Sequence, residues 1–439
     1  MALKILTLYD NFYLLYNLYQ DKFTMQLIKN EKIIDIMEKT LNHMDPRLVD
    51  HGKRVAYMIF KILEKQRKYD NKQLRDICIL AMLHDVGAYK TEEIDKMVVF
   101  ETADVWEHSV YGYLFLKYFS PLKELSDIIL YHHANCGEVE RLSADHQTLA
   151  QLISMCDRAD IFAHSGNSTA AFLEHLLKYR DKKYFGYIVD MFIKADIDIR
   201  AIYDDMDSDV LFNQVFRGTP LTEDEVSGYI RMIIFSIDFR SSQTVIHTVA
   251  TACIAGALAR LLGADENEID RIRTGAMLHD IGKMGIPVHI LESPDKLSES
   301  DFAIMKTHVE ITEKILDGNV DDDIKNLAVR HHEKLNGTGY PKKLTASEIA
   351  LYDRIVIIAD IFSALCGARS YKSEFPKEKI IGILNEMSGL LDAEIVALTI
   401  EHFDEIYEAV KRESRPAIND YNMINDEYER IIKDRQLKL

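Results

Sequence analysis

The sequence is poor in residues that interrupt helices and in residues that cross-link small domains. It holds only 8 prolines and 19 glycines among 439 residues, which is typical of long helices rather than of a turn-rich β protein. Its five cysteines are scattered and form no CxxC pair. This pattern excludes a disulfide framework and a zinc-finger site, and it fits a reducing compartment. No apolar run approaches the roughly 18 residues that a membrane span needs.

Positive charge is also in short supply. The 53 basic residues are outnumbered by 71 acidic ones, and the formal net charge is −18. This balance argues against a nucleic acid polymer or an anionic membrane as a partner. A phosphate ligand must therefore be held by a few local cations or by metal. Residues 1–23 are apolar but interrupted by polar residues, and no cleavage site follows. We expect them to form an amphipathic helix packed on the body of a cytoplasmic protein, with a partner-binding or membrane-surface helix as the alternative.

Helical periodicity runs through the whole chain. Apolar residues recur at spacings of three and four over 244–263, and 379–412 has the pattern of two helices broken near Ser388 and Gly389. No stretch alternates in the manner of a strand, so the sequence predicts an all-α fold. A polar, acidic stretch over 197–224 predicts a boundary between two domains, 1–205 and 206–439.

Histidines and aspartates recur in the same order in the two halves of the chain. Equivalent positions are 195 to 203 residues apart, which indicates a tandem duplication of one helical domain. The last position of the first series fits either Asp157 or Asp160. We favour Asp157 because an arginine follows it directly. The first series is His51, His84, Asp85, His108, His132, His133 and Asp157, and the second is His247, His279, Asp280, His308, His331, His332 and Asp360.

These residue types are those that bind borderline divalent metals such as iron, manganese and zinc. Adjacent residues on a helix point about 100° apart. Asp280 is therefore suited to bridge two ions while His279 binds one of them. A single histidine on an apolar helix is usually a core residue, but the ordered repeat predicts a metal site.

Two motifs in the second half carry a family resemblance. They are HDIGK at 279–283 and HHEKLNGTGYP at 331–341, and ADIFSALCGARSYK follows at 359–372. On these residues the second half resembles the HD-GYP branch of the HD-domain metallohydrolases, which are cyclic dinucleotide phosphodiesterases. The close match spans roughly 220–412. The first half resembles an HD domain through its metal-ligand pattern alone, and we interpret it as a degenerate copy.

The resemblance implies two metal ions, iron first or else manganese. One ion is expected on His247, His279, Asp280 and Asp360, and the second on His308, His331 and the bridging Asp280. His332 is expected either to bind metal or to orient a ligand. Family members with a third ion use a glutamate where this chain has Gln243, so a third ion is not expected.

The resemblance also implies the residues that contact substrate. Lys283 is expected to hold a phosphate or the leaving oxygen and, with Asp280, to be catalytic. Gly337 and Gly339 would shape a loop that holds Tyr340 over the metals as a hydrogen-bond donor or a stacking partner for a base. Arg369 and Lys372 would clamp the second phosphate. Ser363 stands where the family commonly has an aspartate, which we interpret as structural.

The first half lacks the residues that are expected to contact substrate in the second half. Ala88 stands where the second half has Lys283, and Arg141 occupies the position of the loop tyrosine. Three interpretations stay open for this half. It binds metal as a regulatory or sensory module, it keeps the ligands as a structural metal site, or it is an enzyme for another phosphate substrate.

The sequence therefore predicts metal-dependent hydrolysis of a cyclic dinucleotide in bacterial second-messenger signalling. The substrate is cyclic di-GMP or 3',3'-cyclic GMP-AMP, and the products are the linear dinucleotide and, on further hydrolysis, mononucleotides. The alternative is an effector that binds a cyclic dinucleotide without hydrolysing it. The charged last segment, 416–439, carries a spaced apolar stripe and fits either a homodimer contact or packing on the second domain.

Overall fold

The computed structural model describes seven stretches of the chain. No β-strand occurs among these residues, which pair only in three isolated bridges, and the all-α prediction is confirmed. No helix in the described stretches is long and apolar enough to cross a membrane. The predicted helix over 1–23, Arg369, Lys372 and the side chain of Gln243 lie outside the described residues. The stretches are 27–45, 48–88, 106–206, 209–239, 242–293, 295–367 and 375–436.

The described chain forms two compact units. The N-terminal unit holds Ile33–Ser236 and residues 427–436, and the C-terminal unit holds Ile237–Asp426 and residues 27–32. The units therefore divide at 236–237 rather than at 205–206. The extents 1–205 and 206–439 remain a prediction about functional domains.

Packing explains why the N-terminal unit extends past residue 205. The Phe212 ring lies 5.2 Å from the Tyr57 ring and 5.5 Å from the Phe60 ring. Phe235 stacks on Phe119 at 4.6 Å. These aromatic contacts bury the apolar faces of the helices that follow the predicted boundary.

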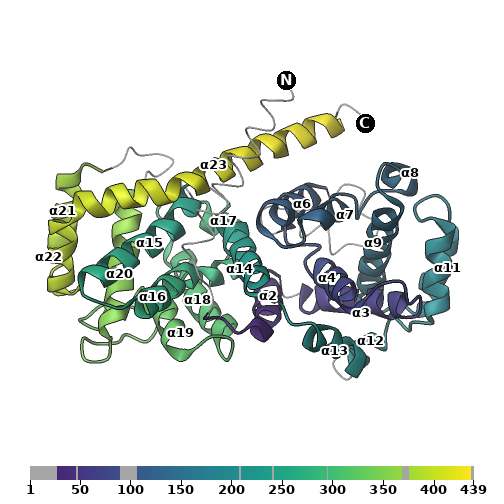
Figure 1. The fold of residues 1–439 in the computed structure, drawn as a ribbon, viewed down its shortest axis with the longest axis horizontal. Coiled ribbons are helices and arrows are strands. Elements are labelled where there is room, and N and C mark those ends of the chain that lie inside the picture. The colour runs from purple at the N-terminus through teal and green to yellow at the C-terminus, as the bar shows by residue number, and fades with distance from the viewer. Residues whose placement is uncertain are drawn as a thin grey trace. The chain divides into compact units, whose positions relative to one another are not determined.

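Helices make up the N-terminal unit. Within it α3 packs against α4 and α9, and α6 packs against α7 (Figure 1). Its elements are α2 (Ile33–Asn42), α3 (His51–Glu64), α4 (Asn71–Met82), α6 (Glu107–Phe119), η4 (Lys123–Leu125), α7 (Ser126–Leu130), α8 (Cys136–Val139), α9 (Ala144–His164), α10 (Thr169–Lys178), α11 (Gly186–Ala195), α12 (Ile202–Asp205), α13 (Val210–Gly218) and most of α14 (Glu223–Asp238).

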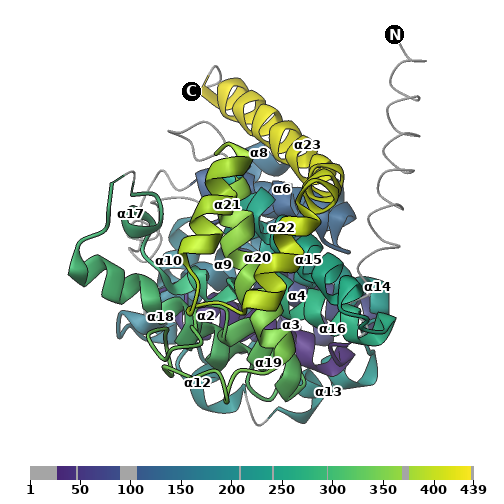
Figure 2. The ribbon, with the colours of Figure 1, turned by 90° about the vertical axis from the view of Figure 1, so that its left-hand side faces the viewer.

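The C-terminal unit repeats this arrangement. There α15 packs against α16 and α20, and α18 packs against η5 and α19. Figure 2 shows α20, α21 and α22 of this unit side by side. Its elements are η1 (Asn30–Lys32), α15 (Ser242–Leu261), α16 (Glu266–Leu278), η5 (Ile281–Gly285), α17 (Val288–Leu291), α18 (Glu299–Leu316), α19 (Asp322–Val329), α20 (Leu351–Cys366), α21 (Lys377–Glu386), α22 (Ala393–Glu401) and most of α23 (Phe403–Gln436).

The predicted pair of helices over 379–412 is three helices. The expected break occurs where Gly389 adopts a φ of 80°, a left-handed conformation that favours glycine. A second break occurs at His402, which caps α22 before α23 begins at Phe403. The apolar pattern continues across this break, so periodicity alone does not reveal it.

The same device starts the helix before each His-Asp pair. Asp70 caps α4, where its side chain accepts a hydrogen bond from the backbone N–H of Gln73 at 2.8 Å. In turn, the side-chain oxygen of Gln73 accepts the backbone N–H of Asp70. Asp265 and Glu268 form the matching capping box on α16, with both bonds at 2.9 Å. Such a cap contributes about 1 kcal/mol. Each helix is thus fixed at its start and delivers a His-Asp pair at its end.

A glycine after each His-Asp pair lets the turn approach the next ligand-bearing helix. A Cβ on Gly87 would lie 2.1 Å from the carbonyl oxygen of His108, and a Cβ on Gly282 would lie 2.0 Å from that of His308. Only glycine fits at such a distance. Both turns are therefore packed tightly against a helix that carries a further predicted ligand.

Candidate metal centres

All seven predicted ligands of the second half converge in the C-terminal unit. Helix ends deliver four of them and helix interiors the other three, and most are buried, with His247 and His332 partly exposed. The ligands are His247 on α15, His279 and Asp280 after α16, His308 on α18, His331 and His332 after α19, and Asp360 on α20.

Asp280 lies at the middle of this cluster. Its Oδ2 is 3.1 Å from Nε2 of His279 and 3.8 Å from Nε2 of His247. Its Oδ1 faces the other side, 3.5 Å from Nε2 of His308. The two carboxylate oxygens thus point to two groups of imidazoles, as a bridge between two ions requires.

Asp360 completes the first group of ligands. Its Oδ1 lies 3.1 Å from Nε2 of His247 and 3.7 Å from Nε2 of His279, and its Oδ2 lies 3.7 Å from Nδ1 of His332. His308, His331 and His332 have their ligand atoms within 4.8 Å of one another and form the second group.

Backbone carbonyls set the tautomer of three of these histidines. Nδ1 of His279, of His308 and of His331 each donates to the carbonyl oxygen three residues earlier, at 2.6 Å. A proton on Nδ1 leaves Nε2 of the neutral ring with a free lone pair. Nε2 of His279 is buried and has no hydrogen-bond partner. An unpaired buried nitrogen beside two carboxylates fits a divalent metal ion.

The electrostatics of the cluster favour a cation. Burial lowers the pKa of His279, but the charges of Asp280 and Asp360 outweigh it and raise that pKa to about 9. Burial lowers the pKa of His332 to about 4. Burial alone would raise the pKa of both carboxyls, yet the surrounding cationic groups hold them well below their usual range. The site thus keeps both carboxylates ionised beside a neutral His332 imidazole, and the excess negative charge around His279 is what a bound cation would neutralise.

Lys283 and Tyr340 lie where the sequence places them, beside the cluster. The Lys283 ammonium forms an ion pair with Asp280, and this charge keeps the pKa of Lys283 raised despite burial. The Tyr340 ring lies 4.7 Å from the His332 ring, and its backbone N–H donates to the His332 carbonyl at 3.2 Å. Burial raises the pKa of the Tyr340 phenol, which stays protonated.

Glu333 anchors the glycine-rich loop, a role that the sequence analysis missed. Its side chain is 1% exposed, and its carboxylate accepts the backbone N–H of Lys342 at 2.7 Å and that of Leu344 at 3.0 Å. Gly339 packs so closely that a Cβ there would lie 2.5 Å from Cα of Glu333, while Gly337 has a φ of 76°. An acidic residue directly after a His-His pair was the available signal.

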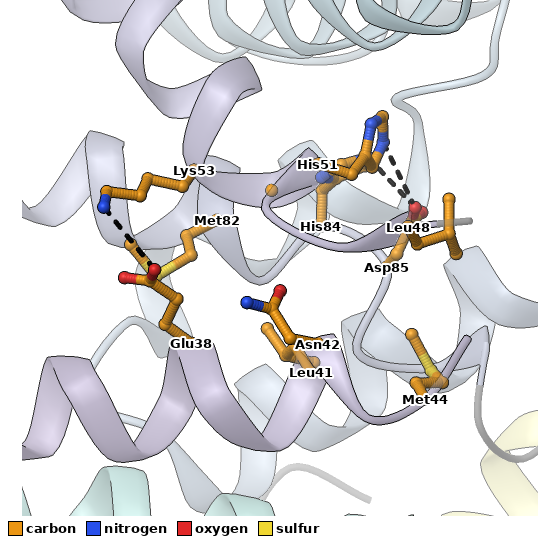
Figure 3. Close-up of a pocket in the computed structure, with 11 residues that line it drawn as sticks. Glu38, Leu41, Asn42, Met44, Leu48, His51, Lys53, Met82, His84 and Asp85 are labelled. Atoms are coloured by element: carbon orange, nitrogen blue, oxygen red, sulfur yellow. Dashed lines mark hydrogen bonds and ion pairs between the residues drawn. The ribbon is translucent and has the colours of Figure 1, made fainter. Parts of the chain in front are cut away.

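The seven predicted ligands of the first half also converge. Oδ2 of Asp85 lies 3.3 Å from Nε2 of His84 and 3.6 Å from Nε2 of His51, and Figure 3 shows both rings directed at this carboxylate. Oδ1 of Asp85 lies 3.6 Å from Nε2 of His108. The ligands are His51 on α3, His84 and Asp85 after α4, His108 on α6, His132 and His133 after α7, and Asp157 on α9.

The structure separates the roles of Asp157 and Asp160. Oδ1 of Asp157 faces the cluster, 3.4 Å from Nε2 of His51. Asp160 lies on the other side of that ring, where its Oδ2 accepts Nδ1 of His51 at 2.7 Å and its carboxylate also accepts the Arg54 guanidinium. Asp160 therefore orients the candidate ligand His51, while Asp157 faces the cluster.

Ser363 plays the matching part in the C-terminal unit. Its Oγ lies 2.9 Å from Nδ1 of His247 and 2.7 Å from Oγ1 of Thr251, and it donates to the Asp360 carbonyl. The position interpreted as structural therefore contacts a candidate ligand directly.

A buried arginine distinguishes the N-terminal cluster. Arg158 is 5% exposed, and its guanidinium donates to Oδ2 of Asp157, with nitrogen–oxygen distances of 3.0 and 3.1 Å. The residue after Asp360 is Ile361, so Asp360 has no such neighbour in sequence. A small pocket beside this cluster is lined by Glu38, Asn42 and Lys53 and reaches His51, His84 and Asp85 (Figure 3).

Comparisons with known proteins agree with the duplication. Two family models, each described as an HD domain, match residues 48–161 and 229–395. A solved structure of a cyclic GMP-AMP-specific phosphodiesterase of Vibrio cholerae, V-cGAP3, matches with a TM-score of 0.52 and 18% identity over 88% of this chain and 98% of its own. At that identity the match shows the fold alone.

Curated relatives are cyclic dinucleotide phosphodiesterases. The 3'3'-cGAMP-specific phosphodiesterase 1 of V. cholerae serotype O1 is 24% identical, over 83% of this chain and 90% of its own length. Phosphodiesterase 2 of that bacterium is 38% identical over 39% of this chain, and the match spans only 33% of the relative. A cyclic di-GMP phosphodiesterase of Thermotoga maritima is 33% identical over 44% of this chain and 53% of its own length. This chain belongs to the HD-domain family and carries one HD domain in each half.

Proposed function

We propose that this protein is a metal-dependent phosphodiesterase that hydrolyses a cyclic dinucleotide at the C-terminal centre. The observation that carries the proposal is the joining of three features in one place: a cluster suited to two metals, the Lys283 ammonium against Asp280, and Tyr340 held against His332. The relatives named above act on 3'3'-cGAMP or cyclic di-GMP, and these are the substrates we propose.

The C-terminal cluster would hold two divalent ions. His247, His279, Asp280 and Asp360 would bind one, and His308, His331 and His332 would bind the other together with Asp280. When bound, such ions neutralise charge on phosphate oxygens and lower the pKa of water. We propose that the ions are iron or manganese. We propose two ions rather than three because Gln243 stands where family members with a third ion have a glutamate.

The remaining residues of the site would position the phosphodiester. The protonated phenol of Tyr340 is available to donate a hydrogen bond to a phosphate oxygen. The ammonium of Lys283 is charged and can stabilise a phosphate or donate a proton to the leaving oxygen. Arg369 and Lys372 are proposed, from the sequence, to hold the second phosphate. The products would be the linear dinucleotide and, on further hydrolysis, mononucleotides.

The N-terminal unit is proposed to bind metal in a regulatory or structural role. It has Ala88 in place of Lys283 and Ala134 in place of Glu333, so it lacks both the ammonium and the loop anchor of the other centre. The five cysteines are free thiols, which fits the proposed cytoplasmic location. A homodimer formed through the terminal segment remains part of the proposal.

An anaerobic turnover assay tests this function. The full chain, loaded with ferrous iron or with manganese, is incubated with cyclic di-GMP and with 3',3'-cyclic GMP-AMP, and the products are separated by chromatography. The expected result is metal-dependent appearance of the linear dinucleotide. Tight binding of both compounds without turnover under either metal would contradict the enzyme and support a binding effector instead.

A further inference from the structure

A large aromatic side chain lies exposed next to the glycine-rich loop. Phe302, near the start of α18, is 47% exposed, and its ring lies 6.4 Å from the Tyr340 ring at 83°. The Tyr340 ring in turn lies 4.7 Å from the His332 ring. Three rings therefore lead from the metal cluster to the surface. An isolated exposed phenylalanine is common, so the residues around Phe302 decide whether it is evidence for a binding site.

A cation accompanies these rings. Nζ of Lys306, one helical turn after Phe302, lies 5.2 Å from the centre of the Phe302 ring and 5.9 Å from that of the Tyr340 ring. Lys306 precedes the candidate ligand His308 by two residues on α18. In a chain with a net charge of −18, a lysine beside two aromatic rings favours a ligand that is both anionic and aromatic.

The N-terminal unit has a different residue at the position that corresponds to Lys306. Trp106 lies two residues before His108, as Lys306 lies two residues before His308. Trp106 is only 9% exposed, and the Arg435 guanidinium lies 3.2 Å from the centre of its ring. The position of Lys306 is thus filled in the N-terminal unit by a buried ring with a guanidinium of the same chain against it, whereas in the C-terminal unit a lysine stands there beside the exposed Phe302.

We propose that Phe302, Lys306 and Tyr340 form a nucleobase subsite of the C-terminal centre. One base of the cyclic dinucleotide stacks on the Phe302 ring, and Lys306 faces the phosphate attached to that nucleoside. Aromatic stacking tolerates any base because every base has a π face. The subsite therefore raises affinity for nucleotide substrates over simple phosphodiesters. This inference rests on the proposed function.

The test separates base binding from the chemistry at the metals. Phe302→Ala should raise the KM for cyclic di-GMP about tenfold, within the range measured for base–aromatic stacking, with kcat and metal content unchanged. Phe302→Trp should restore the KM because it restores a stacking surface. The matched control is Ile304→Ala, since Ile304 is 40% exposed on the same helix and should change neither parameter.

Two outcomes would overturn the subsite. One is a KM for Phe302→Ala within twofold of the wild-type value, and the other is an equal rise in Ile304→Ala. If the wild type hydrolyses no cyclic dinucleotide, the proposed function fails on its own. The subsite is then tested by calorimetric binding of cyclic di-GMP to the same metal-loaded variants, where unchanged affinity in Phe302→Ala contradicts it.

Discussion

The two metal centres have the same ligand types in the same order but different surroundings. In the C-terminal centre, Lys283 pairs with the central carboxylate and Glu333 fixes a loop that carries Tyr340. In the N-terminal centre, Arg158 occupies one oxygen of Asp157. The difference teaches that the arrangement of His and Asp side chains can be kept in both halves of a duplication while the cations and loops around it change.

Among changes outside the candidate metal ligands, the largest expected effect comes from removing the Lys283 cation, which only the C-terminal sequence has at this position. Lys283→Ala should lower kcat for cyclic di-GMP about 10²- to 10³-fold, as removal of one charge-stabilising donor does in other enzymes. Metal content should stay at the wild-type level. Lys283→Arg keeps the charge and should recover part of the rate. An unchanged kcat in Lys283→Ala would remove this residue from the mechanism.

The second prediction concerns a variant in which the N-terminal centre is made more similar to the C-terminal centre. Arg158→Ile places there the residue type that follows Asp360. Because one partner of a buried ion pair is lost, the metal-free variant should be less stable by about 3 kcal/mol. Manganese should restore stability by replacing the lost positive charge. Urea unfolding with and without manganese measures both effects, and a variant that manganese does not stabilise would contradict this role of Arg158.

The third prediction concerns the loop that only the C-terminal centre has. Glu333→Ala leaves two backbone N–H groups without their acceptor, which should lower the unfolding free energy by about 2 kcal/mol. Since Tyr340 then loses its fixed place, kcat/KM should fall about tenfold. Glu333→Gln keeps an acceptor oxygen and should fall less. Equal losses in both variants would argue that charge, rather than loop anchoring, is what matters.

The fourth prediction is a pH optimum of stability in the metal-free protein. For His51, burial lowers the pKa, but hydrogen bonds and charges of Asp157 and Asp160 raise it to about 10. The pKa of His279 is raised to about 9. These raised groups contribute stability that is present below the unfolded value near 6.5 and lost as pH rises through 9 to 10.

Two other histidines act in the opposite direction. Burial lowers the pKa of His132 to about 3 and that of His332 to about 4. Their contribution is present above about pH 6.5 and is lost as pH falls toward 4. Together with the raised pair, they place maximal stability of the metal-free protein near pH 6.5. Urea unfolding at pH 5, 6.5 and 9 checks this, and stability that rises steadily from 5 to 9 would contradict it.

The duplicated helical fold and the two groups of His and Asp residues were predictable from the sequence, because the spacing of these residues repeats in the two halves. The near-constant separation of the two His/Asp series predicted one duplicated helical domain, and the structure brings each series together. The sequence favoured Asp157 over Asp160 as the last ligand, but it did not predict that Asp160 would orient the His51 ring. Both lie on α9 three residues apart, and only the folded geometry shows which faces Nε2 of His51 and which faces Nδ1.

The features that the sequence did not predict depend on contacts between residues far apart in the chain. The place of Glu333 after a His-His pair singles the residue out, but it does not reveal that the carboxylate reaches residues 342 and 344, because that contact exists only after the loop has folded back. The division of the compact units at 236–237 also depends on long-range contacts. Polar composition over 197–224 marks exposed connections, whereas the aromatic contact of Phe235 with Phe119 decides to which unit the next helix belongs.

The most direct test of the account compares the two central carboxylates. Asp280→Asn and Asp85→Asn are each loaded with manganese, their metal content is counted, and turnover of cyclic di-GMP and 3',3'-cyclic GMP-AMP is measured against the wild type. We predict that Asp280→Asn loses turnover by about 10³-fold or more, while Asp85→Asn keeps it and loses only metal from the N-terminal centre. Loss of turnover in Asp85→Asn with activity retained in Asp280→Asn would place the chemistry in the other domain and contradict the account.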